Sequence, residues 1–153
     1  RKLTELAGMI SQRLRTVRPG IHIAMYTWGP HVVSGHPVAQ DWPTWAKKGY
    51  IDSVNVSGYC FPDNYGDKYL EVYEQRLVLA KQMLSEASPS CEVTLCLGVK
   101  TSHGEVKSAD DINTYLEIAK KHGYRGVSFF TWSTLLKHLD GFQQNQYLGR
   151  FLE

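Results

Sequence analysis

Apolar positions recur along this chain with two different periods, one typical of helices and one typical of strands. Spacings of three or four positions predict amphipathic helices at the start of the chain, from about 68 to 87, and from 108 to 123. In the first of these helices the apolar positions are Leu3, Leu6, Met9, Ile10, Leu14 and Val17. Short runs rich in aliphatic and β-branched residues lie between helices and predict strands at 21–28, 51–59, 92–100 and 126–132.

Capping residues and glycines predict where two of the helices begin and end. Asp41 is a typical N-cap, and it precedes a short predicted helix over 42–48 that Gly49 should end. Ser108 is the expected N-cap of the last long helix, and Gly123 is its expected stop. The final segment, 134–153, contains spaced leucines and aromatic residues and predicts one or two short helices around Gly141.

The order of these elements predicts one α/β domain over residues 1–153. A helix is followed by four strand-helix units, and strands separated by helices pair in parallel through right-handed crossovers. Two architectures satisfy this order: four units of a TIM-barrel-like fold, corresponding to half of a (β/α)8 barrel, or a small doubly wound parallel sheet.

The alternation of side chains within two strands favours the barrel. Val54 and Val56 alternate with Ser53, Asn55 and Ser57, so one face of that strand is aliphatic and the other is mixed. The 92–100 strand alternates in the same way. A doubly wound sheet is covered by helices on both faces, whereas a barrel strand sends one face to the helices and the other inward.

Composition and charge exclude several classes of protein. The chain has 153 residues, 42% of them hydrophobic, with 17 basic and 15 acidic side chains and no long basic run. We therefore expect a packed core and neither a nucleic-acid nor a membrane partner. The longest apolar runs are of strand length and no leader peptide is evident, although the chain opens at or just before a helix, which leaves room for a preceding segment. The three cysteines and the scattered histidines lack metal-ligand spacing, and no GxGxxG motif or P-loop occurs, so we expect neither a metal nor a cofactor.

Three stretches carry a resemblance to a known family: DWPTWAKKGYIDSVNVSGY, LCLGVK and GYRGVSFFTWSTL. They are similar to the glycosyl-hydrolase-like family 10 proteins of bacteria, over about residues 10 to 140. The resemblance implies the C-terminal half of a (β/α)8 barrel, which needs about 250 residues in full. It also implies hydrolysis of a polysaccharide or oligosaccharide and an extracellular or periplasmic location. Val56 and Trp132 depart from the family pattern, which has methionine and tyrosine near those positions.

Candidate substrate-binding residues lie at the carboxyl ends of the predicted strands, where barrel enzymes collect their chemistry. Aromatic rings with polar atoms can stack on a sugar, and amide or ammonium groups can bind its hydroxyls. These candidates are Tyr26, Trp28, Asn55, Tyr59, Lys100 and Trp132. By contrast, Asp52 opens its strand at the opposite end and is expected to be structural, and Trp42 and Trp45 are expected to be packing anchors.

A catalytic carboxylate pair is harder to find. Glycoside hydrolysis ordinarily uses two carboxyl groups, and no Asp or Glu ends a predicted strand here. Asp63 and Glu105, both in loops on the same side, are the catalytic candidates within this chain. The resemblance implies instead that the acid comes from the other half of the barrel, on a preceding segment or in a homo-oligomer. A non-catalytic sugar-binding barrel and a flavodoxin-like ligand-binding domain remain the alternatives.

Overall fold

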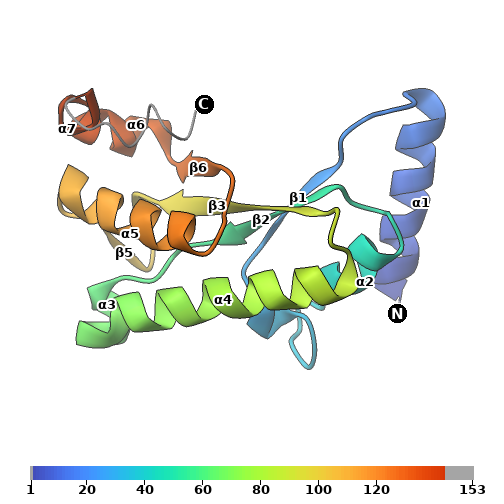
Figure 1. Ribbon diagram of the computed structural model, residues 1–153, viewed down its shortest axis with the longest axis horizontal. Coiled ribbons are helices and arrows are strands. Elements are labelled where there is room, and N and C mark those ends of the chain that lie inside the picture. Colours follow the sequence, from blue (N-terminus) through green and yellow to red (C-terminus); the bar gives the residue numbers. More distant parts are fainter. Residues whose placement is uncertain (1, 144–153) are drawn as a thin grey trace.

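Four parallel strands form the centre of the molecule. The computed structural model describes residues 2–143, and the strands in it are β1 (Ala24–Thr27), β2 (Ser53–Ser57), β3 (Glu92–Gly98) and β6 (Val127–Phe130). They lie side by side in the order β1, β2, β3, β6, and every neighbouring pair is parallel. The predicted α/β architecture with a parallel sheet is therefore confirmed (Figure 1).

Helices connect these strands. The longer helices are α1 (Lys2–Val17), α2 (Trp42–Lys47), α4 (Tyr69–Ala87) and α5 (Ala109–Lys121). Shorter helices follow strand ends or form turns: η1 (Pro30–Val32), α3 (Pro62–Tyr65), η2 (Gly66–Lys68), α6 (Trp132–Leu135), η3 (Leu136–His138) and α7 (Leu139–Gln143). A small antiparallel hairpin of β4 (Lys100–Thr101) and β5 (Gly104–Glu105) follows β3.

The predicted caps are present. An Asp41 carboxylate oxygen accepts a hydrogen bond from the Thr44 amide at 3.3 Å, and Gly49 ends the helix at a φ of 69°. The Ser108 hydroxyl accepts from the Asp111 amide at 3.1 Å, and the Asp111 carboxylate accepts from the Ser108 amide, also at 3.1 Å. These bonds satisfy amides that have no partner within the helix, so they fix where α2 and α5 begin.

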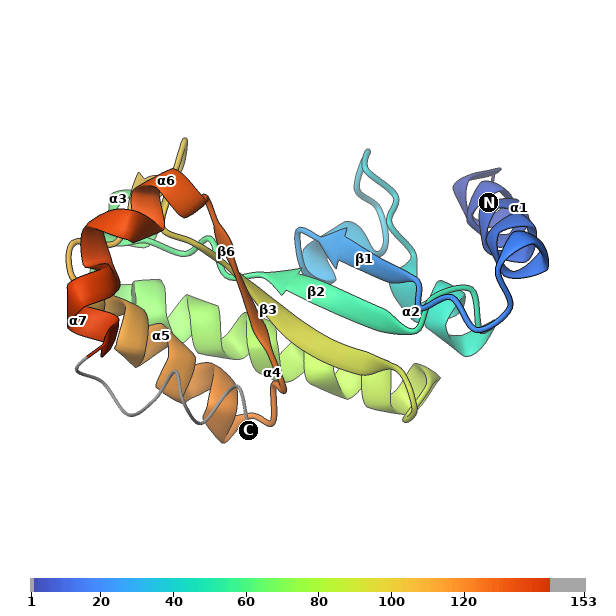
Figure 2. The same cartoon turned by 90° about the horizontal axis from the view of Figure 1, so that it is seen from above.

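The two faces of the sheet have different environments. The aliphatic side chains of β2 and β3 are buried against α4 and α5 in one core: Val54, Val56, Val93, Leu95 and Leu97 on the strands, with Tyr73, Leu77, Ile112 and Leu116 on the helices. In Figures 1 and 2, α4 and α5 run along this same side of the sheet. The other face carries Tyr26, Asn55, Thr94 and Ser128, and no helix of the described residues covers it.

Three residues outside the strands have the structural roles expected of them. Asp52, just before β2, accepts a hydrogen bond from the Ile23 amide at 2.7 Å and lies 2.8 Å from the Arg15 guanidinium. Trp42 and Trp45 are buried, and the Trp45 indole donates to the Thr4 hydroxyl at 3.0 Å, which joins α2 to α1.

Every predicted strand was too long. β1 covers Ala24–Thr27 rather than 21–28, and β2 covers Ser53–Ser57 rather than 51–59. β3 stops at Gly98, and Lys100 instead opens the hairpin, where it pairs with Glu105 across the turn. β6 stops at Phe130, and Trp132 is the first residue of α6. The reason at α6 is local, because the Thr134 hydroxyl accepts from the Thr131 amide at 3.2 Å and so favours a helical turn over further strand.

The apolar stripe of α1 is also placed differently from its prediction. Met9 and Val17 are 68% and 69% exposed, and Ser11 is the residue of α1 that is buried. These residues are exposed because α1 lies beyond the edge strand β1 and packs on α2 instead of covering the sheet (Figure 2). Of the predicted tail helices, α6 to α7 account for 132–143, while Tyr147, Leu148 and Phe151 lie outside the described residues.

Candidate functional site

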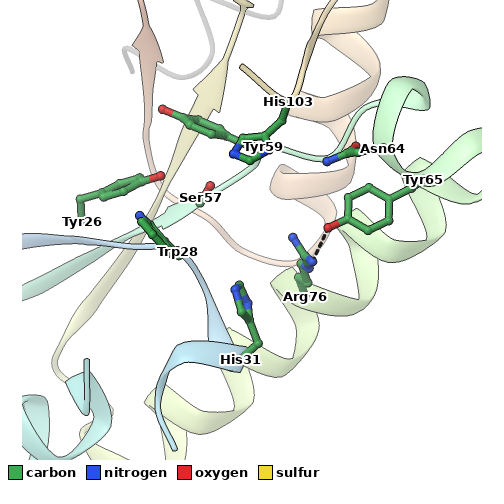
Figure 3. Close-up of a pocket in the computed structure, with 9 residues that line it drawn as sticks. All are labelled: Tyr26, Trp28, His31, Ser57, Tyr59, Asn64, Tyr65, Arg76 and His103. Atoms are coloured by element: carbon green, nitrogen blue, oxygen red, sulfur yellow. Dashed lines mark hydrogen bonds between the residues drawn. The ribbon is translucent and has the colours of Figure 1, made fainter. Parts of the chain in front are cut away.

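A cavity of about 280 Å³ opens beside the carboxyl ends of β1 and β2. Segments that are far apart in the sequence supply its walls (Figure 3). Its lining residues are Tyr26, Trp28, His31, Ser57, Tyr59, Asn64, Tyr65, Arg76 and His103. The parallel strands bring Tyr26, Ser57 and Tyr59 together because the carboxyl ends of such strands meet at one edge of the sheet.

Aromatic rings form a row along this edge. The ring centroids of Tyr26 and Tyr59 are 6.3 Å apart, and those of Tyr59 and Phe130 are 6.2 Å apart. Burial raises the pKa of the Tyr59 hydroxyl, with further contributions from Cys96 and Tyr26, and its oxygen lies 3.8 Å from the Cys96 sulfur. Tyr59 therefore stays protonated at neutral pH and can donate a hydrogen bond to a ligand.

Gly98 makes room for the Tyr59 ring. A Cβ atom at this position would lie 2.8 Å from Tyr59 Cδ1 and 2.6 Å from Thr101 Cγ2, distances that atoms of a real side chain do not tolerate. Any larger residue at the end of β3 would therefore displace Tyr59 or the hairpin. The glycine sets the position of one wall of the cavity.

Arg76 forms the opposite wall, from the second turn of α4. Its guanidinium donates to the Tyr65 hydroxyl at 2.6 Å and to the Cys60 sulfur at 3.5 Å, and its central carbon lies 5.1 Å from the centre of the Tyr65 ring. Burial lowers the pKa of His31, and the charges of Arg76 and His36 lower it further. His31 is therefore mainly neutral at pH 7, with one nitrogen able to donate and the other able to accept.

An open groove adjoins the cavity and contains the two catalytic candidates. Asp63, Lys100, Glu105 and Lys107 line it, and Asn64 and His103 form the wall that it shares with the cavity. The Glu105 carboxylate lies 2.7 Å from the Lys100 ammonium and 3.3 Å from that of Lys107. These two lysines lower the pKa of Glu105, so its carboxylate is ionised at neutral pH.

The structure brings some of the predicted site residues together and separates others. Tyr26, Trp28 and Tyr59 line the cavity, whereas Asp63, Glu105 and Lys100 line the groove. Asn55 lies beside Tyr26 in the sheet register and donates to the Ser128 hydroxyl at 2.8 Å. Trp132 lines neither space and is 64% exposed on α6.

Arg76 is the cavity residue that the hydrophobic pattern did not identify. The spacing in α4 identifies its apolar positions, including Tyr73, Leu77 and Ala80, and assigns no role to Arg76. A signal was present, because Arg76 is three positions from Tyr73 and four from Ala80 and so borders the buried stripe. A charged residue at such a position is a candidate for a wall between core and solvent.

The part of the chain that the structure describes contains neither a metal-binding cluster nor a membrane-spanning helix. No three His, Cys, Asp or Glu side chains in it are grouped closely enough to hold a metal ion, and none of its helices is long and apolar enough to cross a bilayer. Cys60 and Cys96 are buried free thiols, and Cys91 is a half-buried one.

Comparisons with models of protein families, with curated proteins and with solved structures gave no match for this chain.

Proposed function

We propose that this chain is the substrate-positioning part of a carbohydrate-active β/α barrel, and that the complete barrel is a glycoside hydrolase. The observation that carries the proposal is the cavity at the carboxyl edge of the sheet, where Tyr26, Trp28 and Tyr59 lie together with hydroxyl and amide groups. Sugar rings have apolar faces that stack on aromatic rings and hydroxyls that need hydrogen-bond partners. The lining offers both kinds of contact.

The half-barrel part of the proposal is supported by the strand order. The four strands follow one another in sequence across the sheet, and right-handed crossovers in one direction keep their helices on one face. In a closed barrel the other face would point inward, and its mixed side chains, such as Asn55 and Ser128, suit that environment. The exposed apolar stripe of α1 is a surface that further barrel segments would cover.

The carboxyl group of Glu105 in the groove is not suited to act as the catalytic acid. Glu105 is held ionised by Lys100 and Lys107, whereas a general acid must carry a proton at the working pH. We therefore assign Glu105 a structural part in the hairpin and leave Asp63 as the carboxyl group of the groove that could take part in catalysis. The principal acid is assigned to the other half of the barrel.

A second candidate function is sugar binding without turnover. It is favoured by one observation: among residues 2–143, those that line the cavity include no Asp or Glu. A binding barrel needs the aromatic rings and hydrogen-bonding groups but not the carboxyl pair.

A panel of neutral and charged oligosaccharides tests the sugar binding that both candidates require, with the 153-residue chain. Binding is followed by tryptophan fluorescence and by calorimetry. Release of reducing ends is assayed beside it, and turnover by this chain alone would contradict the assignment of the acid to the other half of the barrel. W28A is expected to abolish binding, while W132A, which removes a tryptophan outside the cavity, should bind as the wild type does. Absence of binding to every saccharide would refute the proposal, and equal loss in both variants would move the site away from the cavity.

A further inference from the structure

The charge of the cavity is unbalanced. Among residues 2–143, no carboxylate lies within ion-pairing distance of Arg76, and its two hydrogen-bond partners, the Tyr65 hydroxyl and the Cys60 thiol, are neutral. Burial raises the pKa of the Cys60 thiol, and this effect exceeds the opposing influence of Arg76, so the thiol keeps its proton. The positive charge of Arg76 is thus not neutralised by the residues around it.

The rest of the lining adds no negative charge. It consists of aromatic, hydroxyl and amide side chains and two histidines, and His31 is mainly neutral at pH 7 because burial, Arg76 and His36 lower its pKa. The other charged side chains nearby line the groove: Glu105, which is paired with Lys100 and Lys107, and Asp63, which does not line the cavity. The cavity therefore has a net positive charge on one wall only, the wall that Arg76 forms.

The arrangement of the walls suits a ligand with two different ends. Figure 3 shows Arg76, Tyr65 and His31 on one side of the cavity and Tyr26 and Tyr59 on the other, with Trp28 between them. A guanidinium has five N–H donors in a planar fork and binds an oxyanion through two of them. Two donors of Arg76 are directed at Tyr65 and Cys60, which hold the group in place and leave others for a ligand.

We propose that the cavity binds a sugar ring that carries an oxyanion, with the anion at Arg76 and the ring against Tyr26, Trp28 and Tyr59. This inference rests on the proposed carbohydrate function and narrows its substrate class from saccharides in general to acidic ones. A uronic-acid carboxylate and a sugar phosphate offer the same chemistry to the guanidinium. The cavity volume of about 280 Å³ is at the small end of the range for ligand sites, which suits a single ring.

Four probes separate the possible ligands: glucose, glucuronate, glucose 6-phosphate and inorganic phosphate. Calorimetry with the wild-type chain should show both acidic sugars binding at least tenfold more tightly than glucose, because a hydrogen bond to a charged group is worth roughly that ratio or more. Their relative affinities identify the source of the anion. Glucose binding as well as glucuronate does would overturn this inference while leaving the carbohydrate function intact.

The variant R76Q removes the charge and keeps a polar side chain of similar length. In this variant glucuronate and glucose 6-phosphate should bind no more tightly than glucose does, while R125Q, which removes an arginine at the opposite end of the sheet, should keep the wild-type preference for acidic sugars. If R76Q does not fold, R76K keeps the charge without the fork, and an intermediate preference is expected. Inorganic phosphate that binds as tightly as glucose 6-phosphate would reject the role of the ring, and failure of all four probes would reject the acidic-sugar site. The proposed function falls only if the oligosaccharide panel fails as well.

Discussion

Asp52 joins three segments that are separate in the sequence. Its carboxylate accepts a hydrogen bond from the Ile23 amide in the connection before β1, and it pairs with Arg15 on α1 while it precedes β2. Burial, the largest influence, raises the pKa of Asp52, but the bonds from Ile23 and Arg15 together lower it below its ordinary value. The side chain is thus important for folding, at the end of the sheet away from the cavity.

The variant D52N should reduce the free energy of unfolding at pH 7 by about 1 kcal/mol or more, because it removes the charged partner of Arg15. A carboxyl group whose pKa is lowered by folding contributes stability above its unfolded pKa of about 3.9 and loses it as the pH falls through the folded value. The difference between wild type and D52N should therefore shrink below about pH 4. Urea unfolding at several pH values measures it, with D67N on the exposed turn η2 as the control; a difference that does not change with pH would contradict this account.

Arg76 should control the protonation of His31. In R76Q the pKa of His31 is expected to rise, yet to remain below its ordinary value because burial is the larger cause of the shift. A histidine with a lowered folded pKa makes the protein less stable as the pH falls through about 6.5, so this acid-side loss should be smaller in R76Q. Histidine NMR titration gives the pKa, with R125Q as the control. An unchanged His31 titration in folded R76Q would show that the two charges do not interact.

At the scale of single residues, helix-capping preferences predicted the roles of some side chains, whereas tertiary packing determined the roles of others. Asp41 and Ser108 were predicted as caps because a cap acts on amides two or three residues away. The position of Arg76 depends on how α3 and α4 pack, which brings Tyr65 to its guanidinium. Spacing within one helix carries no information about that contact.

At the scale of elements, helices and strand centres could be predicted from periodicity, but strand ends could not. β3 and β6 were both extended too far, into Lys100 and Trp132. The residues that follow β3 and β6 have compositions typical of strands, but a hairpin turn ends β3 and a hydrogen-bonded helical turn ends β6. This matters for function because the residues after strand ends form the cavity and the groove.

The N-cap of α5 offers a test at this scale. S108A should lower the free energy of unfolding by about 1 kcal/mol, because the Asp111 amide loses its acceptor. T114A, on the exposed face of the same helix, is the matched control, since its hydroxyl bonds only to the Asp110 carbonyl within the helix. Thermal and urea unfolding measure both variants. Equal effects would show that the cap is not what fixes the start of α5.

For the whole molecule, alternation predicted that the two faces of the sheet differ, and the burial of Val54, Val56 and Leu95 confirms the aliphatic one. The same periodicity did not predict that the apolar stripe of α1 would be exposed. A hydrophobic pattern shows that a surface favours burial, but it does not identify what covers the surface. The position of α1 beyond the edge strand β1 is a property of the tertiary packing, which periodicity along one helix does not contain.

The chain expressed alone should therefore self-associate through α1. The double variant M9E/I10E is expected to reduce association, with little change in thermal stability, because both side chains are exposed. V78E/L79E places the same charges on exposed apolar positions of α4 and is the matched control. Sedimentation over a dilution series measures the outcome. A wild-type chain that stays monomeric, or association lost only in the control, would show that the α1 stripe is not the contact.

The alternation within the strands also bears on how readily this protein could acquire a new specificity. Odd and even positions of β2 serve different purposes: Val54 and Val56 hold α4 and α5 in place, while Asn55 and Ser57 face away from those helices. Varying Tyr26 and Ser57, which line the cavity, therefore leaves the aliphatic face of the sheet unchanged. Selection could act on the chemistry of the cavity and on folding almost independently.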